Sequence, residues 1–457
     1  MIPVNAYQNQ TVGVFGLGRS GIAAAEALAA GGAEVLAWDD NPEKTASDGL
    51  SIQDLYRTDL SKLSTLVVAP GVPLDHPLPA RAKRSGCAVV GDIELFQLAR
   101  EELPAHQLVA VTGTNGKSTT TALLGHVLAI AQRPVAVGGN IGIPVLNLQP
   151  LPAGGIYVFE MSSFQLDLTS TLDADVAILL NLTADHLDRH GSLQAYVGAK
   201  AHLFEMQSED QIAVISVDDD KCRAVAADLR QTIVPISVRE ITESGVSVLD
   251  GELWDGMEGT PKAVADLLPC RALRGSHNWQ NAAAVFAAAR LLGVPADTIT
   301  KAFESFPGLP HRLQPVIEAA GVLFVNDSKA SNLDAASKAL AAYDEIFWIA
   351  GGRLKGVLEL NGLAPGLEHV RKAYLIGESA EIFGSYLTRK VPWENSQTIE
   401  NAVETAARDA AASGGGVVLL APAAASFDQF ENFERRGEAF VEAARTAAKA
   451  LGAKEGF

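Results

Sequence analysis

The chain has 457 residues, 48% of them hydrophobic, and a formal net charge of −18. This length and apolar content predict about three domains with substantial cores, and the negative charge argues against a nucleic acid or an anionic membrane as a partner. The three cysteines, Cys87, Cys222 and Cys270, lie far apart and near no histidine cluster, which favours reduced core residues over a disulfide framework or a zinc site. Without a basic-then-apolar leader or an apolar run of about 18 residues, we expect a cytoplasmic protein that does not insert into a membrane.

The first predicted element is a short apolar strand at residues 12–15. It is followed by the glycine-rich run Gly16-Leu17-Gly18-Arg19-Ser20-Gly21 and an alanine-rich helix through residue 30. A second strand at 34–38 ends in Asp39-Asp40, about 18 residues beyond that run. The pattern is typical of a dinucleotide-type fold, in which the loop meets a phosphate and the acid meets a ribose hydroxyl. The alternative is that the glycines only allow close packing of strand against helix.

Two further strands, at 65–69 and 87–90, and a helix at 93–100 complete this first part of the chain. The earlier strand runs into Pro70-Gly71-Val72-Pro73, and Gly91-Asp92 is expected to cap the helix. The segment at 101–104 reads as a boundary. We therefore predict a first α/β domain at residues 1–103.

A phosphate-binding motif, Gly113-Thr114-Asn115-Gly116-Lys117-Ser118-Thr119, follows an apolar strand at 107–111 and opens a helix. In this context backbone N–H groups and the helix N-terminus point at an anion. Lys117 would reach the terminal phosphates of a nucleotide, and the Ser118 hydroxyl would contact Mg²⁺. Val111 stands where the common form of this motif has its first glycine, so the loop is shorter than usual. The alternative is a glycine turn that binds nothing.

The strands after this loop deliver polar side chains at their carboxyl ends, the edge of an open α/β sheet where ligands bind. Strands are expected at 134–137, 156–159, 176–180 and 212–215, with a β-hairpin at Asp250-Gly251 and a helix from Asn278 to Leu292. The polar ends include Asn140, Glu160 and residues 181–190. We predict that residues 104–308 form a central domain.

A third α/β unit is predicted at residues 309–457, beyond the boundary segment Phe306-Pro307-Gly308-Leu309-Pro310. Its strands are expected at 322–325, 346–350, 373–376 and 417–420, and its polar edge residues at 326–329, 351–355 and 422–433. The predicted fold class is thus α/β with three domains: a Rossmann-like first domain, a central P-loop ATPase-type domain and a Rossmann-like C-terminal domain.

Three residues of the central domain are candidates for metal binding or catalysis. Glu160 ends the strand where a second acidic group usually meets the Mg²⁺ of a nucleotide, although a lone Glu at a strand end is more often a cap or an ion-pair partner. His186 lies on the same edge, flanked by Asp185 and Asp188; a lone His is usually structural. Lys200 does not fit a metal site on charge grounds, because an amine repels Mg²⁺, and its ordinary interpretation is a solvated surface lysine.

Several long motifs resemble those of the Mur ligases, and the resemblance runs from about Val12 to the C-terminal helix. The motifs are the phosphate loop, Glu160-Met161-Ser162-Ser163-Phe164-Gln165, Asn181-Leu182-Thr183-Ala184-Asp185-His186-Leu187-Asp188-Arg189, and His311-Arg312 with Asn326-Asp327-Ser328-Lys329. Two further runs resemble the family members that add D-glutamate: Gly91-Asp92-Ile93-Glu94-Leu95-Phe96 and Ser426-Phe427-Asp428-Gln429-Phe430-Glu431-Asn432-Phe433-Glu434-Arg435-Arg436-Gly437.

The resemblance implies a role for each domain: the first binds UDP, the second binds ATP with two Mg²⁺ ions, and the third binds an amino acid. It implies ATP contacts at Gly113, Thr114, Asn115, Gly116, Lys117, Ser118, Thr119, Asn281, Arg312 and Asp327. The UDP-substrate is expected at Gly18, Arg19, Ser20, Asp39, Asp40, Gly71, Asn140 and Ser162, and the amino acid at Lys329, Ser331, Lys355, Ser426 and Phe433. The implied metal ligands are Ser118, Glu160, His186 and Lys200, and the implied catalytic residues are Lys117, His186, Lys200 and Lys329.

In the family the lysine that matches Lys200 is carbamylated by CO₂, which would turn the unsuitable cation into an anion. Two positions depart from the family pattern. Position 331 is Ser where Thr is common, and the loop before Lys355 lacks the polar or acidic residue expected there.

The implied reaction is ATP-dependent joining of D-glutamate to UDP-N-acetylmuramoyl-L-alanine through an acyl phosphate, by an enzyme expected to be monomeric. The alternatives are another step of the same family, a folylpolyglutamate synthase-like ligase, a nicotinamide-dependent oxidoreductase built on the first glycine loop, and a non-catalytic nucleotide sensor. The oxidoreductase would leave Gly116-Lys117-Ser118 unexplained, and a folylpolyglutamate synthase should not need an α/β domain ahead of the phosphate loop.

Overall fold

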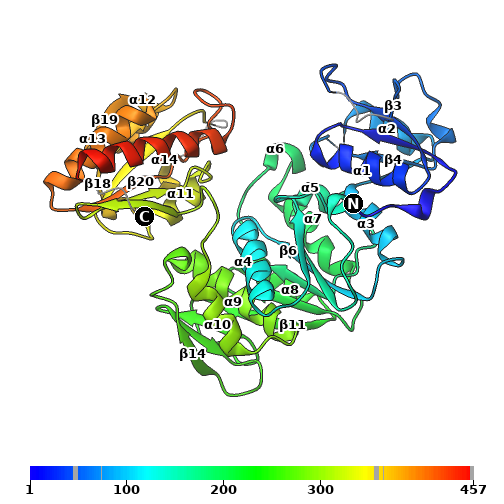
Figure 1. The fold of residues 1–457 in the computed structure, drawn as a ribbon, viewed down its shortest axis with the longest axis horizontal. Helices are drawn as coiled ribbons and strands as arrows, with labels where there is room; N and C mark the ends of the chain where they lie inside the picture. Colours follow the sequence, from blue (N-terminus) through cyan, green and yellow to red (C-terminus); the bar gives the residue numbers. More distant parts are fainter. Residues whose placement is uncertain (45–49, 74, 355–359, 364, 453–457) are drawn as a thin grey trace. The chain divides into compact units, whose positions relative to one another are not determined.

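The computed structural model describes residues 1–44, 50–73, 75–354, 360–363 and 365–452. The described chain forms three sheets with helices packed around them, which confirms the predicted α/β class (Figure 1). Two compact units can be distinguished. The first comprises Met1–Leu267 with Gln280–Glu304 and holds two sheets; the second comprises Leu268–Trp279 with Ser305–Phe457 and holds the third sheet. The three predicted domain ranges stay predictions.

The first sheet has five parallel strands in the order β3-β2-β1-β4-β5. Its strands are β1 (Thr11–Phe15), β2 (Glu34–Trp38), β3 (Ser51–Ile52), β4 (Thr65–Val68) and β5 (Ala88–Val90), and its helices are α1 (Arg19–Ala30), α2 (Pro77–Arg84) and α3 (Asp92–Arg100). The strand order reverses between β1 and β4, where open α/β sheets form a crevice. Gly91 is the N-cap of α3 and Asp92 its first residue, so the helix begins at the expected Gly91-Asp92 pair, although no side chain accepts a hydrogen bond at the cap.

The second sheet has nine strands in the order β14-β13-β12-β11-β10-β9-β6-β8-β7. Its strands are β6 (His106–Thr112), β7 (Val135–Gly139), β8 (Gly155–Glu160), β9 (Val176–Leu179), β10 (Ile212–Ser216), β11 (Thr232–Ser237), β12 (Val246–Leu249), β13 (Glu252–Asp255) and β14 (Lys262–Asp266). Asp250 and Gly251 both have positive φ, as the predicted β12–β13 hairpin requires. The sequence did not predict β11, which contains Pro235, or the largely exposed β14.

Helices flank this sheet and supply several of the residues discussed below. They are α4 (Lys117–Ile130), α5 (Ser163–Leu166), α6 (Leu187–His190), α7 (Leu193–Glu205), α8 (Asp220–Ala227), α9 (Ser276–Leu291) and α10 (Ala296–Ser305). Helix α9 begins two residues before the predicted Asn278.

The first two sheets share one hydrophobic core within the first unit. Phe96 of α3 packs its ring against Tyr157 and Phe159 of β8, at centroid distances of 5.2 and 4.7 Å. The Gly91 N–H donates to the Leu168 carbonyl at 2.9 Å. Helix α3 therefore joins the two sheets of this unit by both packing and hydrogen bonds.

The third sheet has six strands in the order β15-β16-β20-β17-β18-β19, all parallel except β15. Its elements are β15 (Gln314–Ala319), β16 (Val322–Asn326), α11 (Leu333–Leu340), β17 (Ile346–Gly351), β18 (Val370–Ile376), α12 (Ala380–Leu387), β19 (Trp393–Gln397), α13 (Ile399–Ala412), β20 (Gly416–Leu420) and α14 (Phe433–Ala450). Separate cores form on its two faces, with α11 and α12 contributing to one and α13 and α14 to the other. Helix α14 begins at Phe433.

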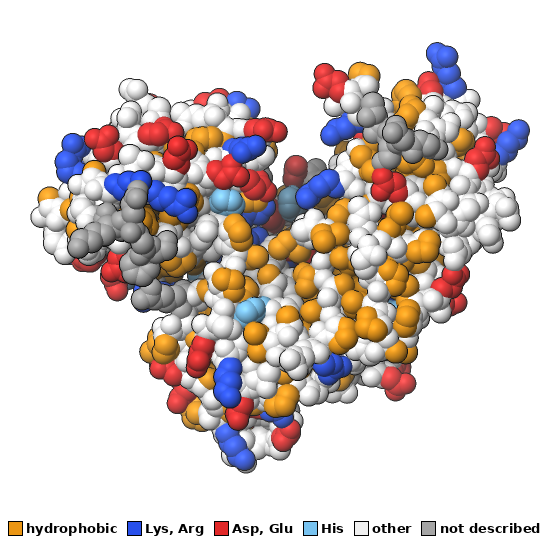
Figure 2. Space-filling view, in the orientation of Figure 1, with side chains coloured by type: hydrophobic (Ala, Val, Ile, Leu, Met, Phe, Trp, Pro, Cys, Tyr) orange, Lys and Arg blue, Asp and Glu red, His pale blue; other side chains and the backbone are white. Residues whose placement is uncertain are grey.

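The surface is mixed in charge. On the face drawn in Figure 2, acidic and basic side chains are interspersed, so the excess of acidic residues is not gathered into one patch on that face. Among the described residues, no helix is long and apolar enough to cross a membrane.

Candidate active site

The predicted phosphate loop lies between β6 and α4, at the carboxyl edge of the second sheet. Its two glycines have positive φ, 145° at Gly113 and 89° at Gly116. A Cβ on Gly116 would lie 2.2 Å from Asn281 Oδ1, so only glycine fits there. Because α4 begins at Lys117, the N–H groups of its first turn adjoin the loop. The predicted strand–loop–helix arrangement is confirmed.

Neighbouring strands brace this loop in one conformation. The Asn115 N–H donates to Asn181 Oδ1 at 2.9 Å, and the Thr114 N–H donates to the Asn181 carbonyl at 2.8 Å. Lys117 Nζ donates to the carbonyls of Gly113 and Thr114 at 2.9 and 2.8 Å. The ammonium group is thus held over the loop, where a phosphate would meet it. Ser118 and Thr119 follow as buried residues of α4.

Glu160 ends β8, the strand beside β6, and pairs in register with Val111. The carboxylate is buried, and Oε1 accepts a hydrogen bond from Asn140 Nδ2 at 2.7 Å. Within the described chain, Oε2 is buried without a partner. A buried carboxylate oxygen left unsatisfied is costly, and a cation beside it would remove that cost. The donor set at this edge therefore fits Mg²⁺, which prefers carboxylate oxygens.

Lys200 is not the solvated surface lysine of its ordinary interpretation, because it lies on α7 with only 1% of its surface exposed. Its Nζ lies 3.4 Å from Thr112 Oγ1 and 4.9 Å from the ring centroid of Tyr196. Burial, reinforced by the charge of Lys117, lowers the pKa of Lys200 well below its usual value, whereas Asp185, Glu160 and Asp167 oppose that shift. The amine is therefore driven towards its neutral, nucleophilic form.

His186 precedes α6 in a left-handed conformation, with φ of 51°. Its ring packs against Phe164 at 4.9 Å, and Nε2 lies 3.6 Å from Asp185 Oδ2. In the part of the chain that the structure describes, no three His, Cys, Asp or Glu side chains are grouped closely enough to hold a metal ion. Ser118, Glu160, His186 and Lys200 thus remain a predicted ligand set, one that needs Lys200 to carry a negative charge.

A cavity of about 420 Å³ opens at the strand-order reversal of the first sheet. Six of the residues predicted to meet the UDP-substrate line it: Gly18, Arg19, Ser20, Asp39, Gly71 and Asn140. Lys44 and Gln165 are among the other lining residues, which were not predicted as substrate contacts, although Gln165 belongs to a motif that carried the resemblance. The cavity brings the first glycine loop together with the polar edge of the second sheet.

The acids after β2 have protein partners. Asp39 Oδ2 accepts a hydrogen bond from the Leu17 N–H at 2.6 Å, which holds the glycine loop against the end of β2. Asp40 does not line the cavity; its carboxylate accepts from Trp38 Nε1 at 3.2 Å and Tyr56 Oη at 3.1 Å. Ser162 also lies outside the lining, as the N-cap of α5. Substrate contacts by Asp40 and Ser162 stay predictions.

In the second unit, four of the predicted residues lie in the loops that follow β16 and β20: Asp327, Lys329, Ser331 and Ser426. Lys329 Nζ lies 3.7 Å from the ring centroid of Phe433, the first residue of α14. Ser331 and Ser426 lie in the loops after β16 and β20, which are joined by an Ala423 N–H to Ala330 carbonyl bond of 2.9 Å. Lys355 lies outside the described residues.

Asp327 and Arg312 are neighbours in this unit. Burial raises the pKa of Asp327 to about 7, against the opposing charge of Arg312 and a hydrogen bond from the Leu313 N–H. The sequence did not single out Arg436, which is fully buried and donates to Ser328 Oγ at 3.0 Å, to the Ser328 carbonyl at 2.9 Å and to the Ala424 carbonyl at 3.0 Å. It thus joins the loops after β16 and β20 to α14.

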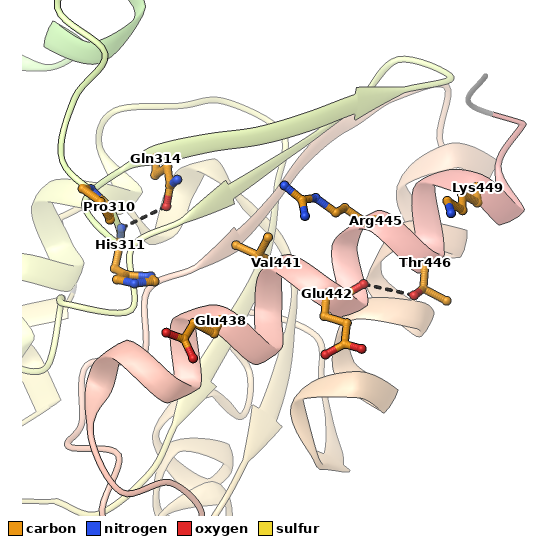
Figure 3. A pocket seen from close by; sticks show the side chains of 9 residues that line it. All are labelled: Pro310, His311, Gln314, Glu438, Val441, Glu442, Arg445, Thr446 and Lys449. Atoms are coloured by element: carbon orange, nitrogen blue, oxygen red, sulfur yellow. Dashed lines mark hydrogen bonds between the residues drawn. The ribbon is translucent and has the colours of Figure 1, made fainter. Parts of the chain in front are cut away.

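A second cavity, of about 550 Å³, lies along α14 and the turn that precedes β15 (Figure 3). Glu438, Glu442 and Arg445 line it from the helix, His311 from the turn, and Gln314 from the start of β15. None of the residues predicted to bind a substrate lines this cavity.

The braced phosphate loop, beside a buried acid at the edge of a largely parallel sheet, defines a nucleotide-binding protein of the P-loop type. Residues 111–289 match the model of the Mur ligase middle domain. The chain is 48% identical to the UDP-N-acetylmuramoylalanine--D-glutamate ligase of Phenylobacterium zucineum, covering 96% of this chain and 97% of the relative. It is 47% identical to the enzyme of the same name from Rhizobium etli, covering 96% of each. This chain belongs to the Mur ligase family and is therefore an ATP-dependent ligase.

Solved structures agree at the level of the fold. The UDP-N-acetylmuramate-alanine ligase of Thermotoga maritima matches with a TM-score of 0.58 and 18% identity, covering 96% of this chain and 99% of that one. A MurF ligase from the same organism, in complex with ADP, matches with a TM-score of 0.59 and 19% identity, covering 87% of this chain and 97% of that one. The family assignment rules out the nicotinamide-dependent oxidoreductase.

Proposed function

We propose that this chain joins D-glutamate to UDP-N-acetylmuramoyl-L-alanine, with conversion of ATP to ADP and phosphate, in the synthesis of peptidoglycan precursors. The observation in the molecule that supports this most directly is the buried Oε2 of Glu160, left without a partner within the described chain one strand from the phosphate loop. The names of the relatives supply the two substrates.

The reaction needs activation, because an ionised carboxylate does not react with an amine: the leaving group would be an oxide. Transfer of the γ-phosphoryl group of ATP to the alanine carboxylate of the UDP-substrate breaks the bond to the β-phosphate and gives ADP and an acyl phosphate. The neutral glutamate amine then attacks the acyl carbon, loses a proton and expels phosphate. The phosphate loop and Lys117 would hold the triphosphate and balance its charge during the transfer.

Ser118, Glu160, His186 and a carbamylated Lys200 are the residues that would hold Mg²⁺ at this edge. When bound, two Mg²⁺ ions would neutralise charge on the phosphates and on the carboxylate. The lowered pKa of Lys200 supports the modification, because only a neutral amine attacks CO₂. A nitrogen–carbon bond forms, one proton leaves, and the product is an anionic carbamate at the position of the cation.

The two remaining substrates have separate places in this proposal. The cavity at the glycine loop would hold the uridine diphosphate, with Arg19 and Ser20 near the pyrophosphate. Lys329, Ser331 and Ser426, with Lys355 and the backbone N–H groups at the start of the helix through Phe433, would hold the two carboxylates of glutamate and leave its amine free to attack. We further propose that the enzyme acts as a monomer in the cytoplasm, where ATP is available.

The test is phosphate release with ATP and UDP-N-acetylmuramoyl-L-alanine while D-Glu, L-Glu, D-Asp, L-Ala, L-Lys and meso-diaminopimelate are supplied in turn. We expect product with D-Glu alone. Faster turnover with L-Lys or meso-diaminopimelate would assign the chain to another step of the family. Turnover with a folate in place of the UDP-substrate would point to a folylpolyglutamate synthase-like ligase, and release that needs no second substrate would contradict ligase activity.

A further inference from the structure

Gln280 is a buried residue of α9 to which the proposed mechanism gives no role. It has 9% of its surface exposed. Its Oε1 accepts a hydrogen bond from Asn181 Nδ2 at 2.9 Å. Its Nε2 donates to Ser216 Oγ at 2.9 Å and reaches Asp218 Oδ2 at 3.5 Å. The side chain of Gln280 therefore connects Asn181, which follows β9, to the carboxyl end of β10.

The groups at the two ends of this hydrogen-bonded chain fix the orientation of both amides. At one end, Asp218 Oδ2 accepts a hydrogen bond from the Val238 N–H at 3.0 Å, so it faces Gln280 as an acceptor. At the other end, the backbone N–H of Asn115 donates to Asn181 Oδ1 at 2.9 Å. An amide has its acceptor and its donors on different atoms. Gln280 is thus held with Nε2 towards β10 and Oε1 towards Asn181.

Asn181 transmits this orientation to the phosphate loop. Its Oδ1 accepts from the Asn115 N–H, and its Nδ2 donates to the Asn115 carbonyl at 3.1 Å. Asn115 lies between Gly113 and Gly116, whose φ angles are 145° and 89°. Because glycine changes conformation at little steric cost, the backbone between them can reorient unless other groups hold it. The Asn181 amide holds both polar backbone groups of Asn115 and so restrains the loop.

We propose that Gln280 is a positioning residue for the nucleotide phosphates, which keeps the Asn181 amide in the orientation that restrains the phosphate loop. This inference rests on the proposed function and deepens it, because it concerns the loop that would hold the triphosphate of ATP. Such a loop binds phosphate through N–H groups that are already in place when the ligand arrives. Without Gln280, the Asn181 side chain loses one of its restraints, and ordering the loop would take up part of the binding free energy.

Gln207 provides a matched control at the opposite edge of the same sheet. It is also a buried glutamine, and its Nε2 donates to the carbonyls of Ala174 and Ile212 at 2.7 and 3.2 Å. Ile212 is the first residue of β10 and Ser216 is the last, so the two glutamines bind opposite ends of one strand. Strands β6, β9 and β10 are parallel, which places the phosphate loop at the Gln280 edge.

The test is the affinity of the full-length protein for ADP with Mg²⁺, measured by calorimetry, together with the Kd for UDP-N-acetylmuramoyl-L-alanine and the melting temperature. Gln280→Leu nearly keeps the size of the side chain and removes its hydrogen bonds, so it should raise the Kd for ADP by roughly three- to tenfold. The Kd for the UDP-substrate should change by less than about twofold. Gln207→Leu should lower the melting temperature as well, but change either Kd by less than about twofold.

Hydrogen exchange followed by mass spectrometry gives a readout at the phosphate loop itself. Backbone N–H groups of the loop, residues 113–117, should exchange faster in Gln280→Leu than in the wild type or in Gln207→Leu. A double-mutant cycle shows whether Gln280 acts through its neighbour. If it does, Gln280→Leu should weaken ADP binding less in an Asn181→Ala background than in the wild type, because the contact is already lost.

Wild-type affinity for ADP in Gln280→Leu, unchanged exchange in the loop, equal effects of the two leucine variants on the Kd, or full additivity in the cycle would overturn the inference and leave the proposed function intact. Should Gln280→Leu not fold, Gln280→Asn takes its place, because a side chain shorter by one methylene cannot reach both Asn181 and Ser216. Wild-type affinity for ADP in that variant would overturn the inference as well. A wild-type protein that does not bind ADP at all would overturn both this inference and the proposed function.

Discussion

Lys200 in the first unit and Arg436 in the second are both cationic side chains removed from water, but their surroundings differ. Arg436 has no exposed surface and donates to two carbonyls and a hydroxyl at 2.9–3.0 Å. Burial lowers its pKa only to about 10, so it stays charged at neutral pH. Lys200 has a single hydrogen-bond contact in the described chain, with Thr112 Oγ1 at 3.4 Å, and its pKa falls well below the usual value.

The comparison shows that hydrogen bonding determines whether a buried cationic side chain keeps its charge. A guanidinium surrounded by acceptors remains an ion and fixes the structure around it. An amine with almost no acceptors and a second cation nearby is driven to the neutral form, which is the reactive one. Burial alone therefore does not distinguish a cation that stabilises the fold from an amine that takes part in chemistry.

The largest expected effect follows from removing the amine. Lys200→Ala should lower kcat by roughly two orders of magnitude or more, because the proposed metal site would lose its carbamate. Added acetate or formate should restore part of the activity by supplying a carboxylate in its place. The measurement is phosphate release with and without each anion. Lys200→Arg is the matched control, since an arginine cannot be carbamylated at neutral pH and should stay inactive.

Two results would contradict the proposed chemical role of Lys200. A Lys200→Ala enzyme with wild-type turnover would show that the buried amine has no chemical role. A variant whose dependence on Mg²⁺ is unaltered would show that the residue acts elsewhere than at the metal site.

The next largest effect concerns Arg436. Arg436→Lys keeps a positive charge but lacks the planar fork, so carbonyls of the loops after β16 and β20 lose their donors. We expect a loss of about 3 kcal/mol and a melting temperature lower by roughly 6–12 °C. Thermal unfolding followed by circular dichroism measures it.

Arg435→Lys is the control for this prediction, because the neighbouring side chain is 63% exposed and pairs with Glu438 at the surface. It should change the melting temperature by less than about 2 °C. Equal shifts in the two variants would mean that the buried hydrogen bonds of Arg436 contribute no more to stability than the surface pair of Arg435.

Local patterns predicted the phosphate loop well, because strand, glycines and helix are adjacent in the sequence and each has its own signal. Most predicted strands match within one or two residues for the same reason. The Asp250-Gly251 hairpin was also readable from its turn residues. Short or exposed strands such as β3 and β14 have too little apolar pattern to be recognised.

Residues whose environment is built by distant parts of the chain were not predictable from local pattern. Arg436 donates to Ser328, 108 positions away. Lys200 looked like a solvated lysine, and only the family resemblance singled it out; it is buried beside Thr112 at the end of β6, and burial and the charge of Lys117 lower its pKa. The cavity was not predictable from local pattern either, because residues from two sheets line it.

The smallest expected effect concerns a buried acid, Asp327. Burial raises the pKa of Asp327 from its model-compound value of 3.8 to about 7, so the folded chain binds a proton there more tightly than the unfolded chain. Stability from this group is complete below about pH 4 and is lost as the pH rises towards 7, by up to about 1.4 kcal/mol per pH unit. Above pH 7 the contribution is flat.

The measurement is the difference in unfolding free energy between the wild type and Asp327→Asn from pH 5 to pH 7. The amide cannot ionise, so the wild type should lose stability relative to the variant as the pH rises through this window. The difference isolates Asp327 from every other titrating group that the two chains share. A difference that does not change with pH would mean that the nearby charge of Arg312 and the Leu313 N–H bond keep the carboxylate ionised, as the acceptors of Arg436 keep that cation charged.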